Sequence, residues 1–508
     1  MLLGRLPGAQ WLFLARGVTG DAGSEHLSAR RRPRPRERGQ DSISGPSARP
    51  GSEQDTTKPT AAAVPATTGA DRSAHATPTR LWHVVFIAVV AIVFTALWLA
   101  VYGLLSGTLW PANYFTVRRW TIPIGVLAFS LIVGLAQKFL RAPTVIDGGV
   151  VNAFKGGENP DYTTFPGALL TSYASLLSGA SVGPEAPLGI LAQDIAEWVR
   201  EKLKLAQETA LGFRVAAMAS AYNGIIGSAL FTGVLATEIG VGGSNALAFL
   251  MWNLLAGVIG FTFFTVLNLH VFAKYIPFTP IGQLTLPYFL VAIALGVLGA
   301  LVAIFVALAF RVFGAVIERI FEDRVVWRAL AAGVIIAIIV FFVPAVMFAG
   351  ETQIFPMIDN PASYGVLALL GLGILKLLLL ALSIKSGFLG GPTFPILFSC
   401  TMFGLALGLL FPGVPISIFV LCIEAAAITL ALRAPLTSIL LVAVIGTADP
   451  NEIALLVLSS VVALIVGHAV QGLLARHAKT QTMSDARPPS ASASAKASPA
   501  PHGTEATA

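Results

Sequence analysis

The chain has 508 residues, of which 55% are hydrophobic and only 12% are charged, and its mean hydropathy is +0.78. A soluble domain carries about 25% charged residues, so this composition excludes a protein with water on all sides. The net charge of +7 comes from residues near both ends and between apolar runs, which is not the pattern of a nucleic-acid-binding protein.

The N-terminal region, residues 1–80, is rich in Arg, Pro, Ser, Thr, Gly and Ala. Its basic run from Arg30 to Arg36 cannot contribute to a core, so we predict that this segment is disordered. A cleaved targeting peptide over residues 1–16 is an alternative for its first part. The Ala/Ser/Pro-rich residues 477–508 are predicted to be a second disordered tail, with no room for a C-terminal regulatory domain.

The region between them, 81–476, is predicted to be a transmembrane domain. It begins with Val84–Leu105, about 20 apolar residues, which is enough to cross a bilayer. The segment 187–205 is amphipathic, and we expect part of it at the membrane interface. The other apolar segments, several of them short or broken by Gly and Pro, are 121–140, 166–182, 208–237, 245–269, 285–315, 328–348, 364–383, 394–411, 415–432, 435–447 and 452–474.

Basic residues at the ends of the spans predict the orientation of the chain. Arg80 precedes the first span, and Arg476 and Lys479 follow the last. Lys and Arg favour the cytoplasmic side, so both termini are expected there, which requires an even number of crossings. The Ala/Gly-rich composition favours a bacterial plasma membrane.

Metal, cofactor and catalytic signatures are missing from the sequence. Cys400 and Cys422 lie in apolar runs and are interpreted as small buried hydrophobic residues. No CxxC, HExxH, His cluster or nucleotide-binding glycine loop occurs. An intramembrane enzyme needs a Ser/Lys pair or two Asp residues facing a cavity, and no convincing pair is found. We therefore expect neither an enzyme nor a bound cofactor or metal.

Two interrupted segments carry the strongest functional signal. The first is Ser178–Pro187 and the second is Ser386–Pro395. Each follows an apolar helix, breaks it with Gly and Pro, and starts a new one. Such a pair in matching positions of two halves is the best sequence indication of a transport site. The alternative interpretation is that both are ordinary loops.

The chemistry of these segments suits a small anion. Free N–H groups at a helix start carry partial positive charge without the tight grip of a lysine. Glycine lets the backbone approach closely, and proline at a helix start costs no hydrogen bond. Irregular backbone at membrane depth is tolerated only in protein or along a cavity. Two such starts facing each other would form an anion site near the midplane.

These motifs resemble the chloride channel and transporter (CLC) family, over roughly residues 85–475. The gating motif of that family corresponds to Gly183-Pro184-Glu185-Ala186-Pro187, and a second motif corresponds to Gly390-Gly391-Pro392-Thr393-Phe394-Pro395. Two further elements match: Arg433-Ala434-Pro435-Leu436-Thr437, and Ala221-Tyr222-Asn223 between the halves.

The resemblance implies an all-α polytopic membrane protein with a CLC-type inverted repeat of tilted and broken helices, assembled as a homodimer. It assigns the gate to Glu185. It assigns anion binding to the backbone around the two motifs: Gly183, Pro184, Gly390, Gly391, Thr393 and Phe394. The expected partners are chloride or another small anion, protons and the lipid bilayer, with no nucleic acid.

The bottom-up interpretation of Glu185 agrees with the resemblance. A carboxylate beside an anion site can occupy that site in place of the anion, and protonation removes its attraction for the helix starts. Glu185 as a simple cap of the following helix is the alternative.

The sequence also departs from the family pattern. The nearest counterpart of the first anion-binding motif is Asp147-Gly148-Gly149-Val150, so Gly148 and Gly149 are assigned to it without a serine or a proline. Pro392 lacks the N–H that is common there. No tyrosine follows Tyr364 to match the pore tyrosine of the family. Anion selectivity is therefore left open.

Two further carboxylates are candidates for a proton path. Glu238 lies in the right region but is displaced by about three residues from the family spacing, and an interfacial charge is an equal alternative. Glu424 lies inside an apolar run, where an ionisable residue is functional by default. A structural ion pair with Arg433 or Lys376 is the alternative for Glu424.

We therefore expect transport of chloride or a similar small anion. Coupling to proton counter-transport is slightly favoured, because family members without C-terminal regulatory domains are often exchangers. A passive gated channel is the first alternative, and a non-transporting membrane scaffold of the same fold is the second.

Overall fold

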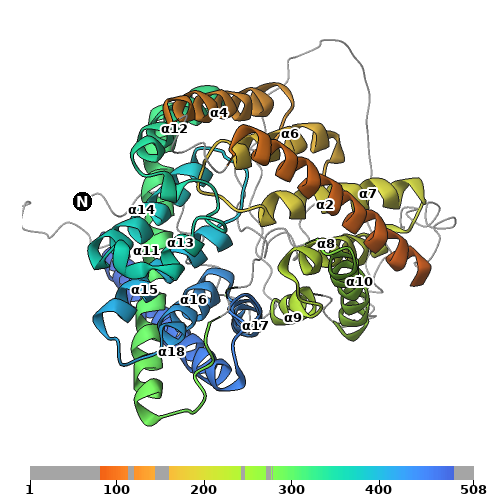
Figure 1. Ribbon diagram of the computed structural model, residues 1–508. Helices are drawn as coiled ribbons and strands as arrows, with labels where there is room; N and C mark the ends of the chain where they lie inside the picture. The colour runs from red at the N-terminus through yellow and green to blue at the C-terminus, as the bar shows by residue number, and fades with distance from the viewer. Residues whose placement is uncertain are drawn as a thin grey trace, which may run out of the picture. The chain divides into compact units, whose positions relative to one another are not determined.

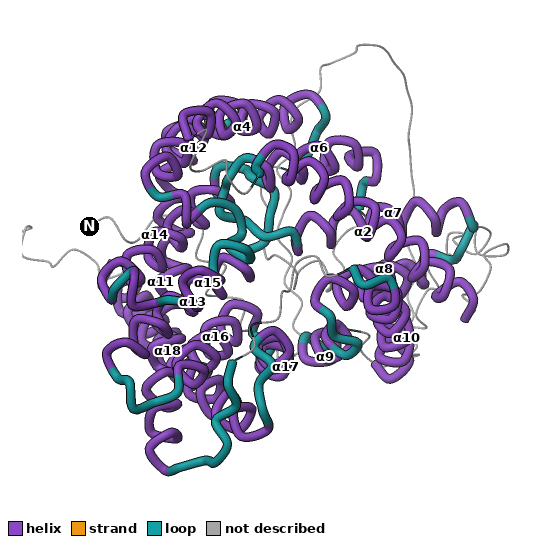
Figure 2. Tube along the Cα trace, in the orientation of Figure 1, coloured by secondary structure: helices purple, strands orange, loops and turns teal. Residues whose placement is uncertain are grey.

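The computed structural model describes residues 81–111, 119–143, 160–241, 246–269, 276 and 278–485. These residues form α-helices joined by loops and short 3-10 turns, and none of them lies in a β-strand (Figures 1 and 2). Eight of the described helices are long and apolar enough to cross a bilayer. Without donors in the lipid, each backbone pairs within its own helix. The prediction of an all-α, multi-pass membrane protein is confirmed.

The helices, in chain order, are α2 (Leu81–Leu109), α4 (Ile122–Phe139), α6 (Phe165–Leu177), α7 (Glu185–Lys202), α8 (Ala210–Ile226), α9 (Phe231–Glu238), α10 (Ala246–Val266), α11 (Leu286–Phe321), α12 (Val325–Phe342), α13 (Phe355–Asp359), α14 (Val366–Lys385), α15 (Thr393–Leu410), α16 (Ile416–Leu432), α17 (Pro435–Ile445) and α18 (Pro450–Asp485).

Packing groups the helices around two buried elements. In the first half of the chain, α8 packs against α2, α7 and α10; in the second half, α16 packs against α11, α15 and α18 (Figure 1). Contacts between α4 and α12, and between α9 and α17, join the halves. The two interrupted helix pairs pack against these elements: α6 against α4, α7 against α8, α14 against α11, and α15 against α16.

Some boundaries differ from the prediction. The apolar segment 208–237 contains two helices, α8 and α9. The Asn223 side chain stabilises the turn between them: its amide nitrogen donates to the Ala229 carbonyl at 2.8 Å, and its oxygen accepts the Thr232 N–H at 3.0 Å. At the other end, α18 continues through residues 477–485, past the predicted end of the transmembrane domain at 476. The predicted disordered segment 1–80 lies outside the described residues.

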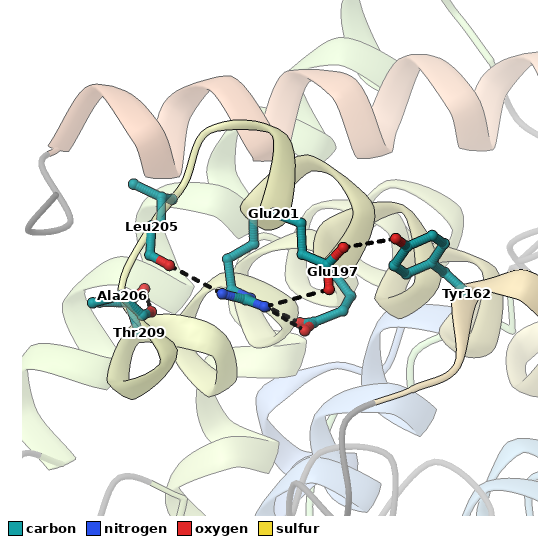
Figure 3. Close-up of polar contacts among 7 residues, drawn as sticks. Tyr162, Glu197, Glu201, Leu205, Ala206 and Thr209 are labelled. Atoms are coloured by element: carbon teal, nitrogen blue, oxygen red, sulfur yellow. Dashed lines mark hydrogen bonds and ion pairs between the residues drawn. The ribbon is translucent and has the colours of Figure 1, made fainter. Parts of the chain in front are cut away.

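The charged end of α7 is more buried than its amphipathic pattern predicts. The Arg200 guanidinium donates to both carboxylate oxygens of Glu197, at 2.8 and 3.1 Å, and to the Leu205 carbonyl at 3.0 Å (Figure 3). One turn away, the Tyr162 hydroxyl donates to Glu201 at 2.6 Å, and this bond raises the pKa of the phenol. These bonds compensate for burying charge, and they close the turn that leads into α8.

Replacing Arg200 is expected to destabilise the fold. An Arg200→Ala variant leaves the buried Glu197 carboxylate and the Leu205 carbonyl without these donors, which costs about 3 kcal/mol. The apparent melting temperature of the purified protein in detergent should fall accordingly. The exposed Lys202, two residues further on, is the matched control, and Lys202→Ala should leave the melting temperature nearly unchanged.

Candidate functional site

The two interrupted segments meet backbone to backbone, as the sequence predicts. The Gly183 N–H donates to the Gly391 carbonyl at 2.8 Å, and the Gly391 N–H donates back to the Gly183 carbonyl at 2.8 Å. Both segments are buried. They are therefore not ordinary surface loops, and the backbone polar groups of the two buried glycines satisfy each other without water.

Each segment leaves its helix in the same way. Gly179 after α6 and Gly387 after α14 both adopt left-handed φ values, +78° and +99°. At Gly387 the bonds Phe388 N–H to Ser383 O and Gly387 N–H to Ile384 O form a Schellman end, a geometry that favours glycine. The chain thereby turns sharply out of the helix and is free to meet the other segment.

Two serines brace the crossing reciprocally. Ser175 on α6 accepts the Leu389 N–H of the second segment at 2.8 Å, and Ser383 on α14 accepts the Ser181 N–H of the first segment at 3.3 Å. Both serines lie 208 residues apart, the spacing that also separates Gly183 from Gly391 and Glu185 from Thr393. The same offset for the bracing serines, the bridging glycines and the helix starts is the signature of two repeats related by a pseudo-two-fold axis.

Glu185 lies at the centre of this crossing. It is the first residue of α7, its side chain is 4% exposed, and its Oε1 accepts the N–H of Thr393, the first residue of α15, at 2.7 Å. The Thr393 hydroxyl and the Phe394 amide also interact with the carboxyl group. Oε2 is buried and has no hydrogen-bond partner among the described residues. A carboxyl group thus occupies the place where two helix starts converge.

The other predicted site residues around it lie as follows. Pro184 and Pro392 immediately precede α7 and α15, so Thr393 offers the first backbone amide of α15. At Gly391 an added Cβ would lie 2.2 Å from Cδ of Glu185, and at Gly390 it would lie 2.3 Å from Cβ of Val182. At both positions a side chain of the first segment would have to move to make room for a methyl group. Gly148 and Gly149 lie outside the described residues, and their assignment remains a prediction.

Tyr222 was not identified as a site residue from the sequence. Its hydroxyl donates to the backbone carbonyl of Glu185 at 2.5 Å, and the ring is buried in α8. The phenol fixes the first turn of α7 from a helix that is distant in sequence. The only sequence signal for Tyr222 was the Ala221-Tyr222-Asn223 element. In the structure, Asn223 stabilises the turn after α8 and Tyr222 contacts the first turn of α7.

Glu238 is engaged at a different helix start. Its carboxylate accepts the N–H groups of Leu436 and Thr437, at 2.6 and 2.8 Å, and the Thr437 hydroxyl at 2.6 Å. Glu238, at the C-terminal end of α9, therefore caps the start of α17 by accepting hydrogen bonds from it. The geometry accounts for this carboxylate as a structural link between the two halves.

Glu424 lies on α16 and is 2% exposed. Its Oε1 accepts the Thr401 hydroxyl of α15 at 2.7 Å. Lys376, one of the proposed ion-pair partners, instead donates to the carbonyls of Val346, Met347 and Phe348. Glu424 also lines a small cavity together with Phe394 of α15 and Glu351.

Comparison with known proteins agrees with this architecture. A cyanobacterial Cl⁻/H⁺ antiporter structure superposes with a TM-score of 0.66 at 18% identity, covering 79% of this chain and 98% of its own. A CLC-type fluoride/proton antiporter gives 0.59 at 21% identity, covering 79% and 97%. A eukaryotic CLC transporter gives 0.56 at 18% identity, covering 77% and 71%. These likenesses establish the fold, including its inverted repeat of broken helices.

Sequence comparison adds the family. A search of curated proteins found no match. The model of the family described as "voltage gated chloride channel", however, matches residues 128–468, a range that includes both interrupted segments and the Arg433–Thr437 element. The chain therefore belongs to the voltage-gated chloride channel family.

Proposed function

We propose that this protein carries chloride or a similar small anion across the bilayer in exchange for protons, with Glu185 as the gate. The observation that carries the proposal is the bond from the Thr393 amide to the Glu185 carboxylate where α7 and α15 begin. A carboxylate oxygen there takes the place of a transported anion. The same donors serve either the side chain or the anion, so the two compete.

Protonation decides this competition. Ionised Glu185 is held by the partial positive charge of the two helix starts, while the neutral acid is held far less strongly. A proton arriving at Glu185 releases the carboxyl group and frees the amides for an anion. When the proton leaves, the carboxylate returns and displaces the anion. Two ions thus share one site and move in opposite directions.

Two of the structurally similar proteins are described as antiporters of protons with chloride or fluoride, and this favours exchange over a passive channel. The Thr393 hydroxyl and backbone amides select for a small anion without fixing which one. Gly148 and Gly149 are proposed to add to the same path.

Flux measurements on proteoliposomes test the proposal. Vesicles loaded with chloride are diluted into low-chloride buffer, and chloride release and external pH are followed together. Exchange predicts that outward chloride flow drives protons inward against their gradient. Chloride release without proton movement would replace exchange by a passive channel. If no halide is released, the protein is instead a membrane scaffold that does not transport.

Assembly and orientation belong to the same proposal. The family resemblance favours a homodimer in which each subunit has its own path. The basic residues Arg80, Arg476 and Lys479 favour cytoplasmic termini, and the Ala/Gly-rich composition favours a bacterial plasma membrane. Cross-linking in membranes should trap a dimer. Tags at both termini should react with an external, membrane-impermeant reagent only after the cells are permeabilised.

A further inference from the structure

The Tyr222 hydroxyl contacts two backbone groups in the first turn of α7. It donates to the Glu185 carbonyl at 2.5 Å, and the Gly189 amide, four residues further along the helix, interacts with the hydroxyl oxygen. Glycine at position 189 makes this contact possible, since an added Cβ there would lie 2.3 Å from that oxygen. The tyrosine is 1% exposed on α8, so its ring has little freedom to move. A neighbouring helix therefore holds the first turn of α7 at both of its ends.

The start of α7 offers few free amides for an anion. Pro184 and Pro187 have no N–H, and the Leu188 N–H donates to the Pro184 carbonyl at 3.1 Å. Glu185 and Ala186 therefore supply the unbonded amides of this turn. The Glu185 amide interacts with its own carboxyl group. Among the described residues the Ala186 N–H has no acceptor, so it is the amide of α7 that remains for a transported anion.

The Ala186 amide and the carbonyl bound by Tyr222 belong to the same peptide group. The Glu185 carbonyl and the Ala186 N–H share one planar, conjugated unit. A hydrogen bond accepted by the carbonyl draws electron density toward oxygen and makes the N–H a stronger donor, by about 10–30% per bond. The bond from Tyr222 also fixes the plane of the peptide group and so the direction of its N–H. A hydroxyl on α8 is thereby connected to the anion donor of α7 without contacting the anion.

We propose that Tyr222 is a positioning residue that raises anion affinity by polarising and orienting the Ala186 amide at the start of α7. This inference rests on the proposed transport function. The Glu185 carboxyl group binds the Thr393 amide of α15, so the gate keeps that partner when the hydroxyl of Tyr222 is removed. Rotation about the side-chain bonds of Glu185 leaves its carbonyl in place, so the bond to Tyr222 persists while the gate moves. Tyr222 is therefore expected to affect how tightly the anion binds and not its coupling to protons.

The chloride dependence of flux in vesicles tests this role. Tyr222→Phe keeps the ring and removes only the hydroxyl. We expect the chloride concentration that gives half-maximal flux to rise roughly two- to fourfold, as for a weakened charge-assisted hydrogen bond, with the maximal rate and proton coupling kept. Tyr173→Phe is the matched control, because the Tyr173 hydroxyl also donates to a backbone carbonyl, that of Trp98 on α2, at 3.1 Å. Its half-maximal concentration should equal that of the wild type.

A double-mutant cycle tests the contact itself. Gly189→Ala places a methyl group against the phenol oxygen and displaces it, so this variant should raise the half-maximal concentration by a similar factor. In Tyr222→Phe that oxygen is gone, so adding Gly189→Ala should have little further effect. Full additivity of the two changes would contradict the proposed contact.

The other outcomes separate this proposal from a structural role and from the proposed function. An unchanged half-maximal concentration in Tyr222→Phe, even with a lower melting temperature or maximal rate, would show that Tyr222 only supports the fold. An equal rise in Tyr173→Phe would also overturn the proposal. Wild-type vesicles that release no chloride would instead contradict the transport function itself, before any variant is compared.

Discussion

Vesicles containing the Glu185→Gln variant are expected to pass chloride without moving protons. Glutamine has nearly the same shape but no proton to carry, and its neutral amide loses the charge-assisted bond to the Thr393 N–H. That loss is worth about 2 kcal/mol, which shifts the balance between bound and released side chain roughly thirtyfold. Chloride flux should therefore rise, and external pH should stay constant while chloride leaves.

The pH dependence of flux provides the control. In the wild type, acid protonates Glu185 and releases it, so chloride flux rises as the pH falls. The glutamine side chain does not titrate, so this rise should be absent or much smaller in the variant. A variant with wild-type coupling and a wild-type pH profile would show that Glu185 only caps α7.

Gly391→Ala is expected to stop chloride flux without unfolding the protein. Its methyl carbon would lie 2.2 Å from Cδ and 2.3 Å from Oε1 of Glu185, far inside van der Waals contact. If the Glu185 carboxylate and the transported anion occupy the same site, the methyl group excludes both from that site. The methyl group displaces the buried Glu185 side chain from the Thr393 amide, so we expect a cost of about 1–3 kcal/mol, which the fold should survive. Flux should fall to that of protein-free vesicles.

Two other glycines provide controls for this result. An added Cβ at Gly371 on α14 has no neighbour within 4 Å, so Gly371→Ala should transport normally. At Gly390 the Cβ would lie 2.3 Å from Cβ of Val182 and would push the two segments apart, at a cost of about 1–3 kcal/mol. Normal flux in Gly391→Ala would show that the anion passes elsewhere.

Local backbone chemistry made the centre of the site predictable. Glycine and proline at matched positions dictate where helices break, and a single acid between them identifies the gate candidate. The helix ends were less predictable, because spans that are apolar all round carry little periodicity. The division between α8 and α9 depends on the Asn223 side chain, which pattern alone does not reveal.

Contacts between helices distant in sequence were beyond prediction. Tyr222 reaches Glu185, and Glu238 reaches Leu436 and Thr437, only after the helices have packed. The sequence left Glu238 with two interpretations of equal standing, a proton-path carboxylate and an interfacial charge, and neither anticipated its three hydrogen bonds at the start of α17. Likewise, the apolar run around Glu424 revealed an unusual acid but not the cavity beside it.

The reciprocal Gly183–Gly391 bond has a consequence for biosynthesis. Its two ends are separated by the same 208 residues as Glu185 and Thr393, which at about 5–20 residues per second represents roughly 10–40 s of translation. Throughout that interval the amide and carbonyl of Gly183 have no permanent partner, and lipid offers none. The nascent first half must therefore wait in a hydrated or chaperoned setting until the second half is inserted, and a truncated chain ending before α14 should be degraded rather than accumulate.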